Sequence, residues 1–352
     1  MSKINIFTNA DFGNKTNLKT KEVSHIIKPL DKNIENIYCR SCYGVNDKRY
    51  NALIPFQDRI PKIMYVLGLY NKTHNLFDWF ASKKKIDNGS INIYYPHKFY
   101  NTIKKNKKNF NIGFIASILE LKFQYLKYFN YILVLSDYNK ELLLKKKIPK
   151  EKIYITPLGV DTERFKPGKK KDDVFRIIAV ANYGLLKGFQ YLLKAWEELN
   201  LKNAELIFVG NPSKEMKKTT KEYKKKLDNF RTVPHTDPVV YYQNSSLLVH
   251  PSLTEGSAKV IYEAMSCGLP VITTFESGSV VRDKKDGFII PARNSNAIKE
   301  KILYFHNNPE KIKEMGKNAR ENILKNYTWD HFSERVYKII KDICKKEGLK
   351  LN

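Results

Sequence analysis

Short apolar runs alternate with more polar, helix-forming stretches along most of the chain. Residues 3–8 form an alternating apolar run that ends in a turn-rich loop around Gly13. This alternation is the pattern of a half-buried strand, and a short uninterrupted apolar run is typical of a buried one. In the first half of the chain we also expect strands at residues 91–95, 112–116, 131–136 and 153–156, with helices at 102–108 and 139–147.

A second series of strands and helices begins near residue 176. We expect strands at 176–181, 204–209, 246–250, 271–274 and 287–290, and helices at 188–199, 256–265, 296–326 and 329–346. Strands that alternate with helices favour parallel α/β sheets. Residues 165–173 contain Pro, Gly and a run of charges, which is the composition of a linker between the two series.

The chain of 352 residues is therefore predicted to form two domains of the α/β class. Each is predicted to be a doubly wound, Rossmann-like sheet, the first over residues 1–166 and the second over 172–328. A C-terminal helical segment covers 329–352. Ligands of open α/β sheets bind at the carboxyl ends of the strands, so we expect the ligand in a cleft that both domains face.

The formal net charge of +27 is large enough to need a reason. It suits an anionic lipid surface, a phosphorylated substrate or a nucleic acid, and it also fits a coding bias toward lysine. The basic residues are mostly lysine and no nucleic-acid-binding motif is present, so we expect no nucleic acid partner. An anionic membrane surface, met through the basic N-terminal half, is the partner that we predict besides the substrates.

No long uncharged run marks a signal peptide or a membrane-spanning helix. The most apolar region, residues 110–135, is interrupted by Glu120, Lys122 and Lys127. A spanning helix needs about 20 mostly uncharged residues. We therefore predict a cytoplasmic protein whose only membrane attachment is peripheral, on the inner face.

Two of the four cysteines lie close together, in the sequence Cys39-Arg40-Ser41-Cys42. A structural zinc ion takes four ligands, and no second pair is present. We therefore expect reduced thiols and no metal site.

The most informative segment runs from Pro251 to Pro270. A strand leads into a turn at Glu255-Gly256, where we expect the helix to start, and Glu263 follows about two turns later. Gly256 has no side chain to keep a ligand from the backbone, and the free amides of a helix start suit a diphosphate. The two carboxylates are suitable acceptors for paired sugar hydroxyls.

The spacing of these glutamates resembles the signature of the family 4 GT-B glycosyltransferases, the retaining glycosyl transferases of group 1. The context also resembles it, with Pro-Ser before and Glu-Ala-Met, Gly and Pro-Val after. The resemblance implies a GT-B fold and transfer of a hexose-type sugar from a nucleotide-diphosphate sugar to a glycan or lipid-linked acceptor. It also implies retention of configuration, no metal and no cofactor besides the nucleotide sugar.

The same resemblance implies roles for individual residues. Glu255 would contact the hydroxyls of the donor sugar and Glu263 those of the ribose. The amides of Gly256, Ser257 and Ala258 would contact the diphosphate. The proton of the acceptor would pass to a leaving phosphate oxygen, so that no strong protein base is needed.

The segment after the strand at 176–181 resembles the basic pair of the same family. Lys187-Gly188 matches the lysine-glycine half, which implies that Lys187 neutralises the leaving diphosphate. The position of the usual arginine falls on Asn182, which carries no charge, and Arg176 at the strand start is too far away to replace it. A single lysine lacks the fork geometry of arginine, so this departure weakens the expected activation of the donor.

Weaker matches extend the resemblance to about residues 130–345. Residues 158–165 resemble the interdomain stretch of the family, and the last helix resembles one that crosses back to the first domain. His235 is expected either in the nucleobase pocket or as an exposed loop histidine, and Gly13 in the first donor-binding loop. The usual cleft histidine falls on Ser117, and His97 is a candidate substitute.

Two other functions stay open at this point. A hydrolase or epimerase of nucleotide sugars would use the same donor site without an acceptor. A nucleic-acid-binding protein would account for the charge of +27 but not for the two spaced glutamates.

Overall fold

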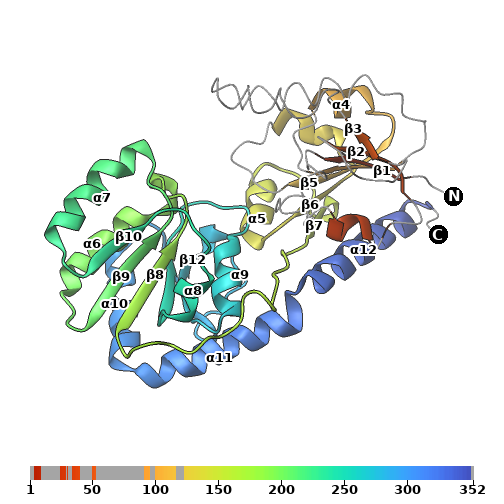
Figure 1. Ribbon diagram of the computed structural model, residues 1–352. Helices are drawn as coiled ribbons and strands as arrows, with labels where there is room; N and C mark the ends of the chain where they lie inside the picture. Colours follow the sequence, from red (N-terminus) through yellow and green to blue (C-terminus); the bar gives the residue numbers. More distant parts are fainter. Residues whose placement is uncertain are drawn as a thin grey trace. The chain divides into compact units, whose positions relative to one another are not determined.

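The computed structural model describes residues 4–8, 24–28, 30, 34–39, 50–52, 91–95, 100–115 and 123–349 (Figure 1). Contacts divide the chain into two compact units. The first unit contains Met1–Thr156 together with Phe332–Asn352, and the second contains Pro157–His331. Both units contain a parallel sheet with helices between its strands, so the predicted α/β class is confirmed.

The first unit contains a sheet whose described strands follow the order β3-β2-β1-β4-β5-β6-β7, with parallel neighbours throughout. These strands are β1 (Ile4–Thr8), β2 (Ile34–Cys39), β3 (Tyr50–Ala52), β4 (Ile91–Tyr95), β5 (Phe110–Ile115), β6 (Tyr131–Val134) and β7 (Ile153–Ile155). The described helices between them are α4 (Tyr100–Lys105), α5 (Asp137–Lys145) and the 3₁₀ turns η2 (Phe123–Tyr128) and η3 (Lys150–Lys152).

Three buried asparagines fix the register of the central strands of this sheet. Asn5 on β1 pairs with Asn92 on β4, and Asn92 pairs with Asn111 on β5. The side-chain amide of Asn5 donates to Asn92 Oδ1 at 3.3 Å, and that of Asn92 donates to Asn111 Oδ1 at 3.1 Å. A register slip would leave these buried polar groups unpaired, which is costly inside a core.

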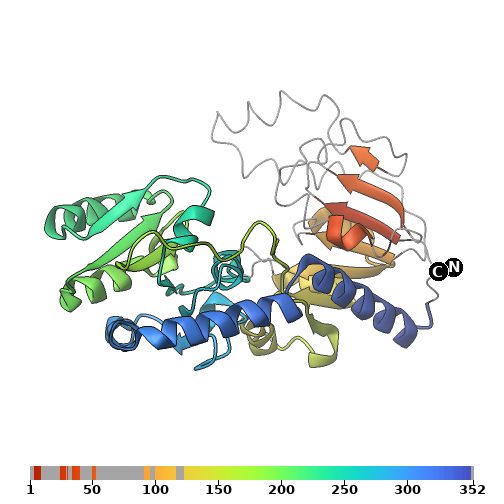
Figure 2. The same ribbon diagram turned by 60° about the horizontal axis from the view of Figure 1, so that its bottom comes forward.

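Helix α12 (Trp329–Lys346) begins in the second unit and belongs to the first from Phe332 onward. Its apolar stripe, made of Phe332, Val336, Ile340 and Ile343, is fully buried. The hydroxyl of Tyr154, on β7, donates to Asp342 at 2.8 Å. Helix α12 therefore lies beside the sheet of the first unit, as both ribbon views show, and Tyr154 links the two (Figures 1 and 2).

The second unit contains a parallel sheet of order β10-β9-β8-β11-β12-β13. Its strands are β8 (Phe175–Val180), β9 (Ala204–Val209), β10 (Phe230–Val233), β11 (Leu247–His250), β12 (Val271–Thr274) and β13 (Gly287–Ile290). Its helices are α6 (Phe189–Leu199), α7 (Lys214–Lys226), α8 (Val239–Gln243), α9 (Lys259–Ser266), α10 (Ser295–Asn307) and α11 (Pro309–Asn326), with 3₁₀ turns η4 (Leu185–Lys187) and η5 (Phe275–Ser277).

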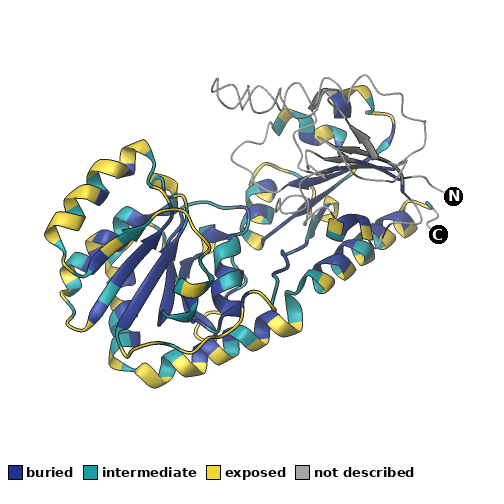
Figure 3. Ribbon diagram, viewed as in Figure 1, coloured by how far each residue is buried: buried dark blue, intermediate teal, exposed yellow. Residues whose placement is uncertain are grey.

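Helices cover both faces of this sheet. Because crossovers between parallel strands are right-handed, α6, which leads from β8 to β9, and α9, which leads from β11 to β12, lie on opposite faces. Helix α10 packs against α6, and α11 packs against α9. The strands are accordingly buried while the outer helix faces are exposed (Figure 3).

The chain reverses its direction of progress through this sheet next to β8. It passes from β8 to β9 and β10 on one side, and then returns to β11 on the other side of β8 before it continues to β12 and β13. From the adjacent strands β8 and β11 the chain therefore continues in opposite directions along the sheet. Such a switch point leaves a crevice at the carboxyl edge of a sheet, where ligands of doubly wound folds bind.

Replacement of Gly210 tests how closely the loops at this edge pack. Gly210 directly follows β9 with a φ of +130°, and a Cβ there would lie 1.8 Å from the carbonyl oxygen of Ala181. We expect Gly210→Ala to lower the free energy of unfolding by about 2–4 kcal/mol, because both the backbone angle and the space exclude a side chain. The measurement is a urea titration of the full chain.

Gly184→Ala is the matched control. The φ of Gly184 is −102°, and a Cβ there would meet only the Ser213 side chain at 3.6 Å. This variant should unfold within about 0.5 kcal/mol of the wild type. Equal destabilisation by the two substitutions would contradict the close approach at Gly210.

Candidate donor-binding site in the second unit

The loops after β8 and β11 meet backbone to backbone at the switch point. Gly188 adopts a φ of +73°, and a Cβ there would lie 1.9 Å from the carbonyl oxygen of Pro251. The N–H of Leu253 donates to the carbonyl oxygen of Leu186 at 2.8 Å. Only glycine permits this approach without strain. Together these contacts bring Lys187, on the first loop, to Glu255, on the second.

Lys187 and Glu255 form an ion pair at this place, through Lys187 Nζ and Glu255 Oε1. Two more groups face the same oxygen: His250 Nε2 at 3.4 Å and the hydroxyl of Ser252 at 3.3 Å. The Glu255 side chain is 17% exposed and that of Lys187 30%, so both stay reachable from solvent. The structure thus brings together the two residues that the resemblance assigned to the donor sugar and to the leaving diphosphate.

Burial by itself would raise the pKa of Glu255. Hydrogen bonding and charge from His250, together with the charge of Lys187, outweigh burial and lower the pKa to about 2. The carboxylate is therefore ionised throughout the physiological pH range. An ionised carboxylate at the mouth of the crevice can only accept hydrogen bonds, which suits a ligand rich in hydroxyl groups.

His250 was not among the residues that the sequence singled out. It ends β11, is 1% exposed, and its carbonyl oxygen accepts a hydrogen bond from Thr273 Oγ1 at 2.8 Å. The available signal was a histidine at the end of an apolar run, five residues before a candidate acid. His250 is a positioning residue, because it holds Glu255 from inside the protein.

The segment after Glu255 differs from the prediction. Helix α9 begins at Lys259 instead of at Glu255-Gly256, and Ala258 is its N-cap residue with an extended backbone. The N–H of Glu255 donates to the carbonyl oxygen of Glu276 and that of Ala258 to Ser277. These bonds hold the segment as a loop, and they engage the Ala258 amide that was expected to contact a diphosphate.

Ser257 ties this loop to its surroundings through its side chain. Its hydroxyl donates to the carbonyl oxygen of Gly278 and lies 2.9 Å from the hydroxyl of Tyr262. Gly256 is buried between Glu255 and Ser257. The loop is therefore fixed before any ligand binds, and the first turn of α9 follows directly.

Glu263 lies on α9 and is partly exposed. Burial raises the pKa of Glu263, while a hydrogen bond from Tyr242 and the charges of Lys259 and Arg164 oppose that effect. The hydroxyl of Tyr242, which is completely buried, donates to Glu263 Oε2 at 3.0 Å. One carboxylate oxygen is thus held by the protein, which fixes the orientation of the other.

Asn182 and His235 join three neighbouring loops through Asn211. Asn182 Oδ1 accepts from the Asn211 N–H at 3.1 Å, and Asn211 Oδ1 accepts from the His235 N–H at 3.4 Å. Both Asn182 and His235 are exposed. They follow β8 and β10, so the structure places them at the same edge of the sheet as Lys187.

Arg176 cannot supply the charge that Asn182 lacks. It lies near the amino end of β8, where its guanidinium pairs with Glu205 at 2.6 Å and with Asp172 at 3.1 Å. The length of β8 separates Arg176 from the carboxyl edge of the sheet, as the sequence indicated. Lys187, by contrast, directly faces Glu255.

Several predicted positions lie outside the described residues, namely Gly13, His97, Ser117 and Cys42. Within the described parts of the chain, no group of three or more His, Cys, Asp or Glu side chains is placed to hold a metal ion. The helices described here are also too short or too polar to span a bilayer.

Comparison with known proteins identifies the second unit most clearly. Residues 160–322 match the family described as glycosyl transferases group 1. An uncharacterized glycosyltransferase of Haemophilus influenzae is 32% identical over 152 residues, which are 41% of this chain and 43% of that protein. The putative colanic acid biosynthesis glycosyltransferase WcaL of Escherichia coli is 25% identical over 211 residues, 54% of this chain and 52% of that protein. The chain thus spans about half the length of these relatives.

Solved structures share the fold over nearly the whole chain. A glycosyltransferase of Rickettsia africae has a TM-score of 0.71 at 18% identity and covers 98% of this chain and 100% of its own. Anabaena HepE in complex with UDP has a TM-score of 0.70 at 13% identity and covers 97% of this chain and 100% of its own. These likenesses confirm the predicted GT-B fold class, with its two parallel-sheet domains.

The family match and the geometry coincide in the same unit. The matched region contains Lys187, His250 and Glu255, which contact one another at the switch point, and Glu263 on the helix that follows. Residues 160–322, slightly less than half of the chain, thus resemble the group 1 glycosyl transferases.

Proposed function

We propose that this chain transfers a hexose-type sugar from a nucleotide-diphosphate sugar to a glycan or lipid-linked acceptor. The observation that carries the proposal is the Lys187–Glu255 pair, which lies between two loops at the switch point of the second sheet. A cation beside an ionised acid fits the two ends of such a donor, its diphosphate and its sugar hydroxyls.

Lys187 meets the charge that grows on the leaving diphosphate. Its ammonium group is reachable from solvent and the Gly188 turn fixes the adjacent backbone, so Lys187 reaches the diphosphate by exchanging Glu255 for a phosphate oxygen. The Ser257 amide and the first turn of α9 add the positive end of a helix dipole nearby. Fixed charges of this kind replace a metal ion, so the proposed reaction is metal-independent.

Glu255 binds the hydroxyls of the transferred sugar. When Lys187 turns toward the diphosphate, His250 and Ser252 still hold Glu255 Oε1, so the carboxylate keeps its place. Glu263 binds the ribose hydroxyls with the oxygen that Tyr242 leaves free. His235 and Asn182 line the adjacent loops, where a nucleobase would lie.

The reaction proceeds with retention. The acceptor oxygen forms its bond to the anomeric carbon on the face from which the phosphate leaves, and the bond from that carbon to the phosphate oxygen breaks. The proton of the acceptor hydroxyl passes to the leaving phosphate oxygen. No protein base is needed, and the residues of the second unit only bind and stabilise charge.

The names of related proteins guide the choice of substrates to test. HepE was solved with UDP and with UDP-glucose, and relatives are named for capsular polysaccharide and for monoglucosyldiacylglycerol synthesis. The test incubates the full chain with UDP-, GDP- and ADP-linked hexoses, with and without glycan and glycolipid acceptors. Release of free sugar without any acceptor product would favour the hydrolase alternative, and an isomerised nucleotide sugar would favour the epimerase.

We place this reaction in the cytoplasm, at the inner face of the membrane where the acceptor is lipid-linked. The net charge of +27 supports attraction to anionic lipids. Flotation with vesicles that contain or lack phosphatidylglycerol measures that attraction directly.

Replacement of Glu255 should separate catalysis from nucleotide binding. We expect Glu255→Gln to lower kcat by about a hundredfold or more, since an interaction with the reacting sugar is lost. Calorimetry should show UDP binding that is unchanged or tighter, because Lys187 is released from its partner. Full transfer activity in this variant would exclude the proposed role of Glu255.

Replacement of Glu263 should instead weaken nucleotide binding. Glu263→Gln is expected to weaken UDP binding about tenfold, because a charged acceptor for the ribose hydroxyls is lost. Tyr242→Phe removes only the group that orients Glu263, so we expect a smaller loss. If UDP affinity fell after the Glu255 substitution and not after the Glu263 one, the two roles would have to be exchanged.

Stability should depend on pH through Glu255. Because its pKa is lowered from 4.5 to about 2 in the folded protein, its contribution is present above pH 4.5 and is lost as the pH falls toward 2. This difference corresponds to about 3 kcal/mol. In urea titrations at pH 6, 4.5 and 3.5, the advantage of the wild type over Glu255→Gln should shrink as the pH falls.

Glu163→Gln is the control for this series, because the side chain of Glu163 is 89% exposed. Its stability difference from the wild type should stay small at each pH. An advantage over Glu255→Gln that stays constant from pH 6 to pH 3.5 would contradict the lowered pKa.

A further inference from the structure

A second cavity of the same unit has no part in the proposed transfer. It lies between α7 and the ends of β9 and β10 and has a volume of about 360 Å³. Its wall includes Gly210 and Asn211 after β9, Thr232 and Pro234 at the end of β10, and residues of α7. The volume lies in the range of small-molecule sites.

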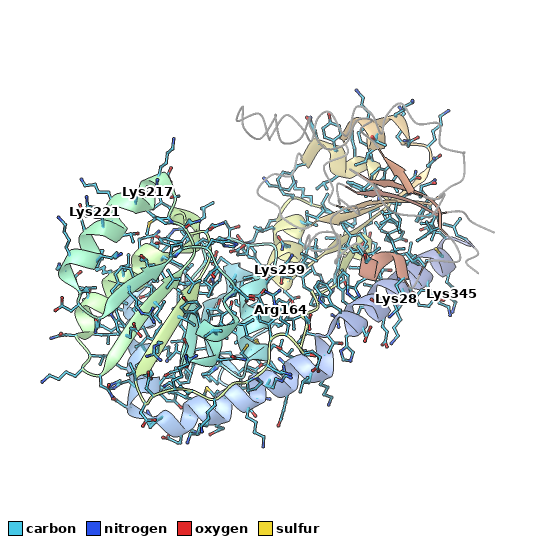
Figure 4. The ribbon with its side chains drawn as sticks, in the orientation of Figure 1. Lys28, Arg164, Lys217, Lys221, Lys259 and Lys345 are labelled. Carbon is cyan, nitrogen blue, oxygen red and sulfur yellow. The ribbon has the colours of Figure 1, made fainter. Side chains whose placement is uncertain are left out.

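Four lysines of α7 line this cavity: Lys217, Lys221, Lys224 and Lys225. Their spacing of i, i+4, i+7 and i+8 places them on one stripe of the helix. Figure 4 labels two of them, Lys217 and Lys221, along α7. Among the described residues, no Asp or Glu side chain belongs to the cavity wall.

Two other lysines of the same helix pair with carboxylates. Lys218 pairs with Glu222 at 4.0 Å, and Lys226 pairs with Glu197. By contrast, in the part of the chain that the structure describes, none of the four cavity lysines has a carboxylate partner. Like charges at i, i+4 spacing repel each other, so this stripe is unfavourable unless an anion lies against it.

The wall of the cavity includes a residue whose buried hydroxyl is poorly paired. Tyr183 is fully buried, its ring is stacked on Phe189, and its hydroxyl makes no hydrogen bond of standard geometry among the described residues. Burial raises the pKa of Tyr183, and a hydrogen bond with Thr220 outside standard geometry opposes that effect, while Thr220 donates its own proton to the carbonyl oxygen of Met216. A poorly paired buried hydroxyl is costly, and a ligand oxygen in the cavity would pair with it better.

The backbone of Tyr183 is held rigidly in this position. Its N–H donates to the carbonyl oxygen of Asn211, and its own carbonyl oxygen accepts from the Ser213 N–H, both at 2.9 Å. The cavity thus combines a fixed hydroxyl donor at its inner wall with mobile ammonium groups at its rim. Phosphate oxygens accept from both kinds of donor.

We propose that this cavity binds the phosphate group of a small phosphorylated molecule, such as a sugar phosphate, at a site distinct from the donor crevice. Tyr183 and Thr220 form its inner wall, and Lys217, Lys221 and Lys224 supply the charge. The site adjoins the donor loops through Asn211, which also contacts Asn182 and His235.

Calorimetry of the full chain with inorganic phosphate and with glucose 6-phosphate tests the site, with glucose as the uncharged control. The double variant Lys217→Gln/Lys221→Gln should weaken the binding of both phosphate probes by about tenfold or more, because charge-assisted hydrogen bonds are lost. Lys214→Gln/Lys218→Gln removes the same charge from the same helix outside the cavity wall, and should bind as the wild type does.

Tyr183→Phe separates a ligand-binding role from a structural one. Without ligand, removal of a poorly paired hydroxyl should leave the melting temperature unchanged or raise it. Phosphate binding should nevertheless weaken roughly two- to tenfold. A purely structural hydroxyl would change stability and leave phosphate affinity as it was.

Several results would overturn the proposal. One is equal weakening by the two lysine double variants, which would indicate nonspecific attraction to charge. Another is displacement of phosphate by saturating UDP, which would assign the cavity to the donor crevice. A third is binding to vesicles of phosphatidic acid with none to either soluble probe.

Discussion

The backbone contact between Gly188 and Pro251 is the constraint on which the donor crevice depends. Lys187 and Glu255 are far apart in the sequence, and they meet only because the loops after β8 and β11 touch main chain to main chain. A side chain at position 188 would place its Cβ 1.9 Å from the Pro251 oxygen, so the loops would have to separate. A steric property of one glycine thus determines where a charge pair forms.

The Lys187–Glu255 pair in turn depends on the side chains that contact Glu255 from inside the protein. Burial disfavours an ionised Glu255, and the fixed neighbours His250 and Lys187 reverse that preference. Because three groups hold the same carboxylate oxygen, Lys187 can turn to a phosphate without releasing Glu255. The site is therefore preorganised for a ligand that brings its own negative charge and its own hydroxyls, and only the lysine has to exchange partners.

The sequence predicted those elements of this unit whose apolar pattern indicates burial. Strands such as 204–209, 271–274 and 287–290 are short apolar runs, and the structure has them with the same bounds. Helix α7 escaped prediction because seven of its thirteen residues are lysine, and only Met216 and Thr220 are buried, so it has almost no apolar period. The start of α9 was placed too early because the amides of Glu255 and Ala258 bond to residues 276 and 277, and such tertiary contacts leave no local pattern.

The lysines of helix α7 bear on the origin of the net charge. A coding bias toward lysine would distribute the residue without regard to helix face or to neighbours. Yet on α7 two lysines pair with acids, while four others form one stripe along a cavity. The described wall of that cavity has no acid and includes a residue whose buried hydroxyl is poorly paired. Electrostatic repulsion within that stripe costs stability in the free protein. A composition effect accounts for the number of lysines but not for this arrangement, whereas an anion bound at the stripe accounts for the arrangement and for the hydroxyl together.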